Sequence, residues 1–456
     1  MADIIKNLIR KSISASGISK LYSIKYNFRQ NNLFNNSLLD REIENFALQI
    51  KVNRNKKELK SENIAFFATE FYEQGGHTVL IKNILQNIPE NYNTELFLTK
   101  KNKSMKNAKK RIKEIANYTK IDGINFSFMY EKKLLKQMFD KIISFSPKTI
   151  IVFMHMNDAF AAAILALLKK HTGIKILFVN FAAHHPSLGM SFADLILELS
   201  PYNAFVTQKY RGLVNTHIIW LAGESEKNLP IFSDEQIRET KTGIGIPQNC
   251  FCTMTGCAAY KLYSGKKSEF LELICRLLEK YENLCHVLIT NMTDELKQII
   301  DSVFQNSKTK NRLLILNFVA NYKPIFKCAD LFIDSFPISN DLTTIDLMSL
   351  KIPFVSMINR ENIIQSFNEY MPKNYPYVFE NLENFEQGVC KLFLDKAERN
   401  RIAEMNYEHF LNFFEGKKVT EKILKLINLD DFNEVFCKIN EQDYKDYGEP
   451  RLVPIV

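Results

Sequence analysis

Short apolar runs alternate with segments of helical period through most of the chain, and this pattern limits the fold more than any other feature. After Asn63 the alternation continues for more than half of the sequence. One helical segment is AFAAAILALLKKH, and another aligns Leu80, Ile84 and Ile88 on one face. Strands that alternate with helices predict a mostly parallel sheet covered on both faces. The runs that we interpret as buried strands in the first half are IAFFAT (64–69), TELFLT, TIIVFMH (149–155), KILFVNF (175–181), DLILEL (194–199) and HIIWLA (217–222).

The alternation stops once and then restarts, which divides the chain. Between Gly223 and Pro247 the apolar pattern lapses, and strand patterns return in CFCTMT (250–255), HVLIT, RLLILNF, DLFIDSF (330–336) and IPFVSM (352–357). We therefore predict an α/β protein with two doubly wound, Rossmann-like domains that face each other across a cleft. The predicted parts are a helical preface (1–60), a first Rossmann-like domain (61–225), a linker (226–247), a second Rossmann-like domain (248–400), and carboxy-terminal helices with a tail (401–456).

The composition is that of a globular protein rather than a membrane-spanning or secreted one. The 456 residues are 46% hydrophobic and 24% charged. No uncharged apolar run approaches the roughly 20 residues that span a bilayer. Lys6, Arg10 and Lys11 interrupt the apolar pattern of the amino terminus, unlike a secretory signal. We therefore expect a cytoplasmic protein.

The cysteine pattern favours a core role over metal binding. Eight cysteines are scattered along the chain, which predicts reduced and mostly buried thiols. Cys250 and Cys252 form a CxC pair inside an apolar strand pattern, so we interpret them as core residues. We expect no structural zinc and no other bound metal.

The net charge of +9 is concentrated in a few places. The segment KKNKSMKNAKKRIK, from Lys100 to Lys113, carries most of the excess and has no aromatic residue for base stacking, so we expect no nucleic-acid partner. A solvated basic helix and a membrane-facing patch remain open for this segment. A second basic segment near the amino terminus predicts peripheral contact with the inner face of the cell membrane. Its cations are Lys6, Arg10, Lys11, Lys20 and Lys25.

Polar residues crowd the start of a predicted helix in the segment DLFIDSFPISNDLTTIDLMSLKIPFVSM (330–357). Backbone N–H groups and the dipole at a helix start favour an anion, and hydroxyl groups add donors to phosphate oxygens. Asp346, one turn into the helix, is placed to accept from ribose hydroxyls. The alternative is an ordinary helix cap at Asn340 or Asp341, and these residues alone leave both interpretations open. The candidate nucleotide contacts here are Ser339, Asn340, Thr343, Thr344 and Asp346.

This segment resembles the donor-binding motif of glycosyltransferases of the GT-B fold. It is especially similar to the catalytic half of the O-GlcNAc transferase group and its bacterial relatives, except that Leu342 stands where the group often has His or Gly. That group also carries a Tyr-Lys pair after the first strand of the domain, and Tyr260-Lys261 follows CFCTMTGCAA here. The resemblance implies that Lys261 contacts the donor diphosphate.

Two glycines and a histidine, Gly75, Gly76 and His77, mark the turn between the first predicted strand and the next helix. Glycines permit close approach of the backbone to a ligand. A purely structural turn, with His77 bonded near a cap at Thr78, is the alternative. Similar turns occur in GT-B enzymes, and this resemblance implies that His77 polarises the acceptor hydroxyl or contacts the diphosphate.

Adjacent histidines, His184 and His185, follow the predicted strand KILFVNF in what we expect to be a loop at the edge of the cleft. Either histidine is a candidate general base for the acceptor hydroxyl. The stretch around His184 resembles bacterial GT-B transferases, although Ala183 stands where an acidic residue is common. Metal binding is the lesser alternative because no third ligand is near. Asp158 we interpret as the amino-terminal cap of the alanine-rich helix.

Taken with this resemblance, the sequence predicts a glycosyltransferase that moves a sugar from a nucleotide-diphosphate donor to a glycan or lipid-linked acceptor in bacterial surface polysaccharide assembly. A UDP-sugar is the expected donor substrate, and no further cofactor is expected. No DxD motif stands out, so we expect a metal-independent enzyme in which helix dipoles and basic side chains neutralise the diphosphate. The alternatives are a protein glycosyltransferase, a nucleotide-sugar epimerase, and an inactive partner subunit of a transferase.

Overall fold

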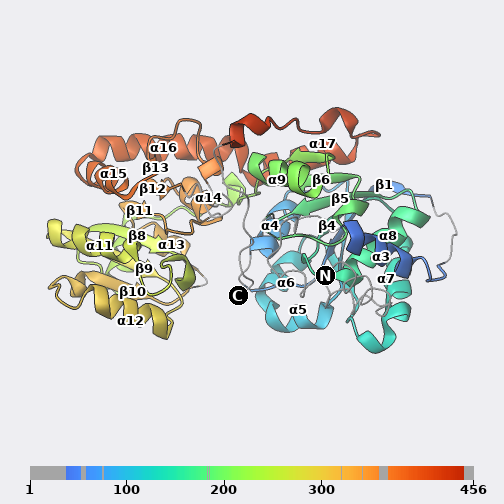
Figure 1. Ribbon diagram of the computed structural model, residues 1–456, viewed down its shortest axis with the longest axis horizontal. Coiled ribbons are helices and arrows are strands. Elements are labelled where there is room, and N and C mark those ends of the chain that lie inside the picture. Colours follow the sequence, from blue (N-terminus) through green and yellow to red (C-terminus); the bar gives the residue numbers. More distant parts are fainter. Residues whose placement is uncertain are drawn as a thin grey trace. The chain divides into compact units, whose positions relative to one another are not determined.

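The predicted alternation forms two parallel sheets in the computed structural model (Figure 1). The structure describes residues 37–52, 58–73, 76–181, 183, 185–319, 321–340, 342–358 and 368–445. The chain divides into two units. Unit 1 comprises Met1–Ala222, Lys417–Gln442 and Arg451–Val456, and unit 2 comprises Gly223–Gly416 and Asp443–Pro450.

Unit 1 is built on a seven-stranded sheet with the order β3-β2-β1-β4-β5-β6-β7, in which every pair of neighbours is parallel. Its strands are β1 (Lys60–Ala68), β2 (Asn93–Leu98), β3 (Lys120–Gly123), β4 (Pro147–Phe153), β5 (Lys175–Asn180), β6 (Leu195–Glu198) and β7 (Thr216–Ile218). Its helices are α3 (Ser37–Ala47), α4 (Gly76–Leu85), α5 (Lys101–Asn107), α6 (Lys109–Ala116), α7 (Glu131–Phe145), α8 (Ala159–His171), α9 (Pro201–Arg211) and most of α17 (Gly416–Ile427).

The core of unit 1 follows from the two periods in its sequence. Strand side chains alternate between the faces of the sheet, so Phe67, Val152 and Phe178 share one face. Helices α3, α7 and α8 cover this face and bury their apolar stripes against it, as the ribbon shows (Figure 1). Helix α8 is the alanine-rich helix expected from the sequence. Its small side chains permit close packing on the strands, and its first ten residues are buried.

Unit 2 is built on a six-stranded parallel sheet with the order β10-β9-β8-β11-β12-β13. Its strands are β8 (Phe251–Gly256), β9 (Leu284–Ile289), β10 (Leu313–Leu316), β11 (Leu331–Ile333), β12 (Phe354–Met357) and β13 (Val378–Phe379). Its helices are α10 (Asp234–Gly243), α11 (Glu269–Lys280), α12 (Asp294–Val303), α13 (Lys323–Phe326), α14 (Leu342–Ser349), α15 (Leu382–Leu394) and α16 (Lys396–Phe413).

The first border lies between Ala222 and Gly223, and the end of the chain is shared, with residues up to Gly416 in unit 2 and Lys417–Gln442 in unit 1. The segment interpreted as a linker, 226–247, contains helix α10. Ser233 and Gln236 form a capping box at the start of this helix, which explains why a polar segment is helical. Among the described residues, no helix is long and apolar enough to cross a membrane.

His286, on β9, is fully buried in the core of unit 2, and its Nδ1 lies 2.9 Å from the Thr253 hydroxyl on β8. Burial lowers the pKa of His286 to about 3. The unfolded chain, in which a histidine has a pKa of about 6.5, binds a proton that the folded chain does not. The free energy of unfolding should therefore fall as the pH drops below about 6.5, by about 2 kcal/mol between pH 7 and pH 5 for this group.

Chemical denaturation at the two pH values checks this expectation. The variant His286→Gln, which does not titrate in this range, should lose less stability on acidification than the unmodified protein. If both proteins show the same pH dependence, His286 is not a neutral core histidine whose protonation opposes folding.

Candidate functional site

The two motifs predicted to bind the donor meet in unit 2. Lys261 ends a short helical turn after β8, and its Nζ donates to the carbonyl oxygen of Ser339, 2.8 Å away, and to Oδ1 of Asn340, 3.3 Å away. Ser339 and Asn340 stand in the loop between β11 and α14. Because β8 and β11 are neighbours in the sheet, their carboxyl ends bring residues from distant parts of the sequence to one edge.

A buried carboxylate that the site prediction did not include holds this loop. Asp334, directly after β11, accepts through Oδ1 from the backbone N–H of Ser335 (2.9 Å) and from the backbone and side-chain nitrogens of Asn340 (both 3.1 Å). Its Oδ2 accepts from the Ser356 hydroxyl, 2.7 Å away, at the end of β12. Burial raises the pKa of Asp334 to about 6, although the hydrogen bonds from Ser356 and Asn340 oppose the shift.

The residues around the start of α14 make several side-chain contacts. The Asn340 side chain is engaged with Asp334, Ser335 and Lys261, so it does not act as a simple cap. Thr344 is buried, and its hydroxyl donates to the Asn340 carbonyl at 2.8 Å. Thr343 is half-buried, and its hydroxyl makes no hydrogen bond with any described residue. Asp341 lies outside the described residues.

Asp346 lies one turn into α14, and the side chains of Tyr322 and Lys323 contact its carboxylate. The Tyr322 hydroxyl donates to its Oδ2, and Nζ of Lys323 lies 3.8 Å from its Oδ1. The Asp346 side chain keeps 19% of its surface exposed. The sequence prediction singled out Asp346 but neither of its neighbours.

In unit 1, four rings gather at the carboxyl ends of β1, β4 and β5. His77, near the start of α4, stacks on Phe181 with the ring centroids 5.4 Å apart and meets the rings of Tyr72 and His155 edge-on. Tyr72 stacks in turn on His155, with the centroids 5.8 Å apart and the planes only 3° from parallel. We call Tyr72, His77, His155 and Phe181 the ring cluster.

The tautomer of His77 follows from its hydrogen bond. Its Nε2 lies 2.8 Å from the carbonyl oxygen of Glu70, which can only accept, so Nε2 carries the proton and Nδ1 is the basic nitrogen. Burial lowers the pKa of His77. Burial also lowers the pKa of His155, and the neighbouring imidazole of His77 lowers it further. Burial raises the pKa of Tyr72 to about 12. Near neutral pH all three rings are therefore uncharged.

A charged side chain, that of Glu70, lies beside the ring cluster. Glu70 follows β1 and is 2% exposed. Its carboxylate oxygens lie 3.0 Å from Nζ of Lys100 and 2.7 Å from Nζ of Lys103. Burial alone would raise the pKa of Glu70, but the two lysines outweigh it and hold the pKa below its usual value. Oε1 of Glu70 lies 3.9 Å from Nδ1 of His155, so the imidazole is beside an anion.

Asp158 is the amino-terminal cap of α8, as predicted. Its Oδ1 accepts from the backbone N–H of Ala161 at 2.9 Å. Its Oδ2 also accepts from the hydroxyls of Thr69 and Thr99, at 2.7 and 3.0 Å. The Thr69 hydroxyl also accepts from the backbone N–H of His155. Through these hydrogen bonds, Asp158 links the carboxyl ends of β1, β2 and β4.

The other residues predicted for the site in unit 1 are Gly75, Gly76, His184 and His185. Gly75 and His184 lie outside the described residues. Gly76 is exposed at the first position of α4. His185 was expected at an exposed loop edge but is 4% exposed, and its carbonyl accepts from the buried guanidinium of Arg211 at 2.9 Å. Glu70, Tyr72, His155 and Phe181 were missed, although each ends a predicted strand or lies within three residues after one, which is the signal that marks them.

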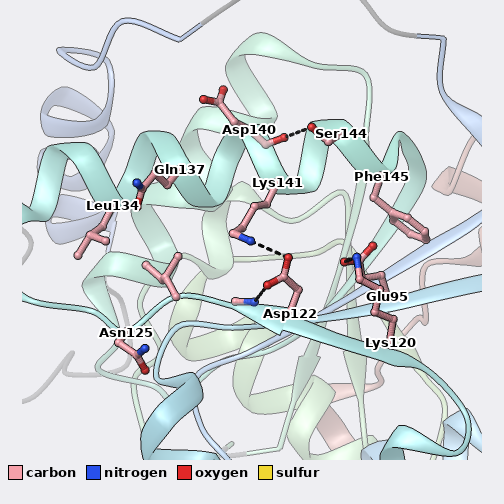
Figure 2. Close-up of a pocket in the computed structure, with 12 residues that line it drawn as sticks. Glu95, Lys120, Asp122, Asn125, Leu134, Gln137, Asp140, Lys141, Ser144 and Phe145 are labelled. Carbon is pink, nitrogen blue, oxygen red and sulfur yellow. Dashed lines mark hydrogen bonds and ion pairs between the residues drawn. The ribbon is translucent and has the colours of Figure 1, made fainter.

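A separate cavity in unit 1 is lined by none of the predicted site residues. Figure 2 shows this cavity of about 840 Å³ beside β2, β3 and α7. Its charged side chains pair with one another: Lys141 Nζ lies 2.7 Å from Asp122 Oδ2, and Lys120 Nζ lies 2.7 Å from Glu95 Oε1. Both of these lysines are therefore paired with carboxylates of the same cavity.

Comparisons with known proteins bear on the fold. No family model matches the chain, and no curated protein matches its sequence. Among solved structures, HepE of Anabaena in complex with UDP and glucose has a TM-score of 0.61 and 14% identity over 80% of this chain and 99% of its own. The chain has a GT-B fold. An O-GlcNAc transferase mutant of Thermobaculum terrenum gives a TM-score of 0.54 and 10% identity over 90% of this chain and 76% of its own. The lipopolysaccharide outer core galactosyltransferase WaaB in its apo form has a TM-score of 0.55 and 13% identity over 80% of this chain and 100% of its own.

The GT-B fold confirms the predicted α/β class with two parallel sheets. In a parallel sheet, ligands bind beyond the carboxyl ends of the strands. Two groups of residues lie at such ends. One is Lys261 with the loop between β11 and α14 in unit 2, and the other is the ring cluster in unit 1. Among the described residues, no group of three or more His, Cys, Asp or Glu side chains is arranged to hold a metal ion.

Proposed function

We propose that the protein is a glycosyltransferase that uses a nucleotide-diphosphate sugar, with a UDP-sugar as the donor. The observation that carries this proposal is the contact of Lys261 with the loop before α14, which joins a cation, the start of a helix and small polar residues. Such a start binds phosphate through backbone N–H groups and its dipole. The complex of the structurally similar HepE with UDP and glucose supports the choice of nucleotide.

In the donor site that we propose, each side chain has a separate task. Lys261 neutralises diphosphate charge, and the Thr343 hydroxyl donates to a phosphate oxygen. Asp346, one turn into α14, accepts from the ribose hydroxyls, as a carboxylate can. Asp334 and Asn340 hold the loop in place beneath the ligand. Ser339 and Thr344 shape the loop through their backbone and hydroxyl contacts.

On the acceptor side we propose that the ring cluster handles the acceptor hydroxyl. Transfer to a hydroxyl requires that its proton be removed near neutral pH. Nδ1 of the uncharged His77 is an available base, because its other nitrogen is fixed by the Glu70 carbonyl. His184 and His185 were the sequence-based candidates. We give His77 priority over His185 because the His185 side chain is buried. His184 lies outside the described residues and stays a candidate base.

We further propose that no metal ion takes part, because Lys261 and the start of α14 supply positive charge at the diphosphate. Full activity after treatment with EDTA would support this, and a strict requirement for added Mg²⁺ or Mn²⁺ would refute it. The acceptor that we propose is a glycan or lipid-linked glycan in bacterial surface polysaccharide assembly, in line with the structural similarity to WaaB. The similarity to an O-GlcNAc transferase favours a protein acceptor as the second candidate.

We place the reaction at the inner face of the cell membrane. The basic segment with Lys6, Arg10 and Lys11 lies outside the described residues. Within them, Lys106, Lys109, Lys110 and Lys113 on and beside α5 and α6 are exposed, and clustered cations attract anionic lipid surfaces. Co-sedimentation with anionic but not neutral vesicles tests this placement.

A thermal-shift panel of UDP, GDP, CMP, ADP and dTDP tests the donor. A ligand that binds only the native state stabilises it by about 2.7 kcal/mol at a concentration of 100 times its Kd. We expect UDP to raise the midpoint of thermal unfolding and the other nucleotides to raise it less. If no nucleotide shifts the midpoint at millimolar concentration, the chain does not bind a nucleotide donor and the proposal fails.

A further inference from the structure

The cavity of Figure 2 lies at one edge of the sheet of unit 1, where β3 stands first in the strand order and pairs with β2. Helix α7 contributes one stripe to its wall, because Leu134, Gln137, Lys141 and Ser144 recur at helical spacing. The volume of about 840 Å³ lies within the range of about 300–1,000 Å³ that small-molecule sites occupy. The cavity is therefore large enough for a small organic ligand.

The charged side chains on the strand side of the cavity are held in pairs. The register places Glu95 of β2 opposite Lys120 of β3, and Nζ of Lys120 lies 2.7 Å from Oε1 of Glu95. Asp122 accepts through Oδ2 from Lys141, which reaches down from α7 (Figure 2), and through Oδ1 from the backbone N–H of Gly123. Burial would raise the pKa of Asp122, but the hydrogen bonds from Lys141 and Gly123 outweigh it and lower the pKa. Asp122 is therefore ionised near neutral pH.

The balance of these charges favours an uncharged ligand. Asp140, the third carboxylate of the lining, pairs with Lys136 on the same helix, with Nζ 2.8 Å from Oδ2. Each charged side chain of the lining thus has a partner of opposite sign. An anionic ligand would compete with a carboxylate for its lysine, and a cationic ligand would compete with a lysine for its carboxylate.

Glu95 offers a hydrogen-bond acceptor to this space. The residue is only 7% exposed, and its Oε2 accepts no hydrogen bond from any described residue, since Lys120 is bound by Oε1 alone. This oxygen nevertheless keeps accessible surface, and Glu95 lines the cavity. A carboxylate that is so deeply buried loses most of its contact with water, so an oxygen without a donor is costly. A hydroxyl group of a ligand in the cavity would supply the missing donor.

Two amides and an aromatic ring complete the lining. The Gln137 amide makes no hydrogen bond with any described residue, so it can both donate and accept. Oδ1 of Asn125 accepts from the backbone N–H of Asn102, while its Nδ2 has no acceptor among the described residues. Phe145 is half-buried and meets Phe97 edge-on, with the centroids 6.3 Å apart. A sugar ring matches this set, because its hydroxyl groups both donate and accept while its C–H face is apolar.

We propose that this cavity binds a neutral oligosaccharide, with Glu95 accepting from a sugar hydroxyl and the amides of Asn125 and Gln137 bonding further hydroxyls. The site is separate from the ring cluster, which lies at the ends of β1, β4 and β5 and shares no residue with the cavity. It holds a glycan without touching the reacting hydroxyl. The choice of a glycan among uncharged hydroxylated ligands rests on the proposed function, in which glycans are the acceptor class.

The test measures binding of maltose, lactose, cellobiose and N,N′-diacetylchitobiose to the full-length protein by saturation-transfer difference NMR, with a titration for each disaccharide that binds. At least one should bind at millimolar concentration. Glu95→Gln, which keeps the size of the side chain, should bind it about tenfold more weakly, because it loses a charged acceptor. Gln137→Ala should weaken binding about threefold and, as a change at an exposed residue, should fold normally. Glu90→Gln removes an exposed carboxylate of unit 1 outside the cavity and, as the matched control, should keep the full affinity.

Hydrogen–deuterium exchange locates the bound sugar, and we expect slower exchange in peptides that cover residues 93–98, 120–125 and 134–145. Binding of none of the four disaccharides would overturn the inference. Affinity unchanged in both Glu95→Gln and Gln137→Ala, or protection confined to other segments, would also overturn it. If UDP stabilises the same preparation while no disaccharide binds, the proposed function stands and this inference alone fails. Binding of a disaccharide in the cavity without any binding of UDP would support the site and count against the proposed function.

Discussion

Lys261→Met should abolish most of the transferase activity, with kcat/KM reduced by about 100-fold or more and UDP bound at least tenfold more weakly. A charge-assisted contact with a diphosphate is roughly twice as strong as a neutral hydrogen bond, and an electrostatic contact to the leaving group gains strength as the glycosidic bond breaks. Nζ of Lys261 is also the donor that holds the Ser339 carbonyl and Asn340 Oδ1, so the substitution disturbs the loop as well. Initial-rate kinetics and calorimetry measure the two effects.

Two further variants distinguish the charge of Lys261 from its packing. Lys261→Arg keeps the cation and should recover part of the UDP affinity that the methionine loses. Lys310→Met, on an exposed pair remote in sequence from the motif, should leave kinetics and binding unchanged. Unaltered UDP binding by Lys261→Met would mean that the diphosphate lies elsewhere and that the Lys261 contact is structural.

His77→Ala should keep UDP binding and lose transfer by about 100- to 10,000-fold, the usual contribution of a general base. The loss should appear in kcat, because Nδ1 of His77 is proposed to act on the acceptor hydroxyl and not on the nucleotide. His155→Ala should lower activity less, because His155 contacts His77 edge-on and orients it. Single-turnover transfer to a lipid-linked glycan fraction, with UDP affinity measured in parallel, gives the comparison.

His217→Ala is a matched control for His77→Ala. Like His77, His217 lies in unit 1 and bonds a backbone carbonyl through one ring nitrogen, here Nδ1 to the Val435 carbonyl at 2.7 Å. It is not part of the ring cluster, so its loss should affect stability but not kcat. Equal losses of kcat in the two variants would show that His77 supports the fold and is not the base.

The sheets were predictable because their signals are local. An apolar run such as IAFFAT and the helical period after it need only neighbouring residues to be recognised, and the parallel order follows from their alternation. The contact between Lys261 and Asn340 was predictable only because both residues belong to a motif with a known resemblance. Helix α10 was missed even though its capping box, Ser233 to Gln236, stands in the sequence, because the polar segment around it lacks a buried stripe.

The rest of the site depends on contacts that no local pattern encodes. Glu70, Tyr72, His155 and Phe181 come from the ends of three strands and meet only through the register of the sheet. His185 is buried where its carbonyl accepts from the guanidinium of Arg211, at the end of α9. The sequence does not reveal that the Arg211 side chain is buried.

We propose that unit 2 binds the diphosphate of a nucleotide sugar at Lys261, at the loop between β11 and α14 and at the start of α14. Hydrogen–deuterium exchange of the full-length protein, with and without saturating UDP, tests this binding site. We expect UDP to slow exchange in peptides that cover residues 257–262 and 335–346, and we expect Lys261→Met to remove this protection. Protection confined to the cavity beside β3 and α7, or no protection in unit 2 at saturating UDP, would contradict it.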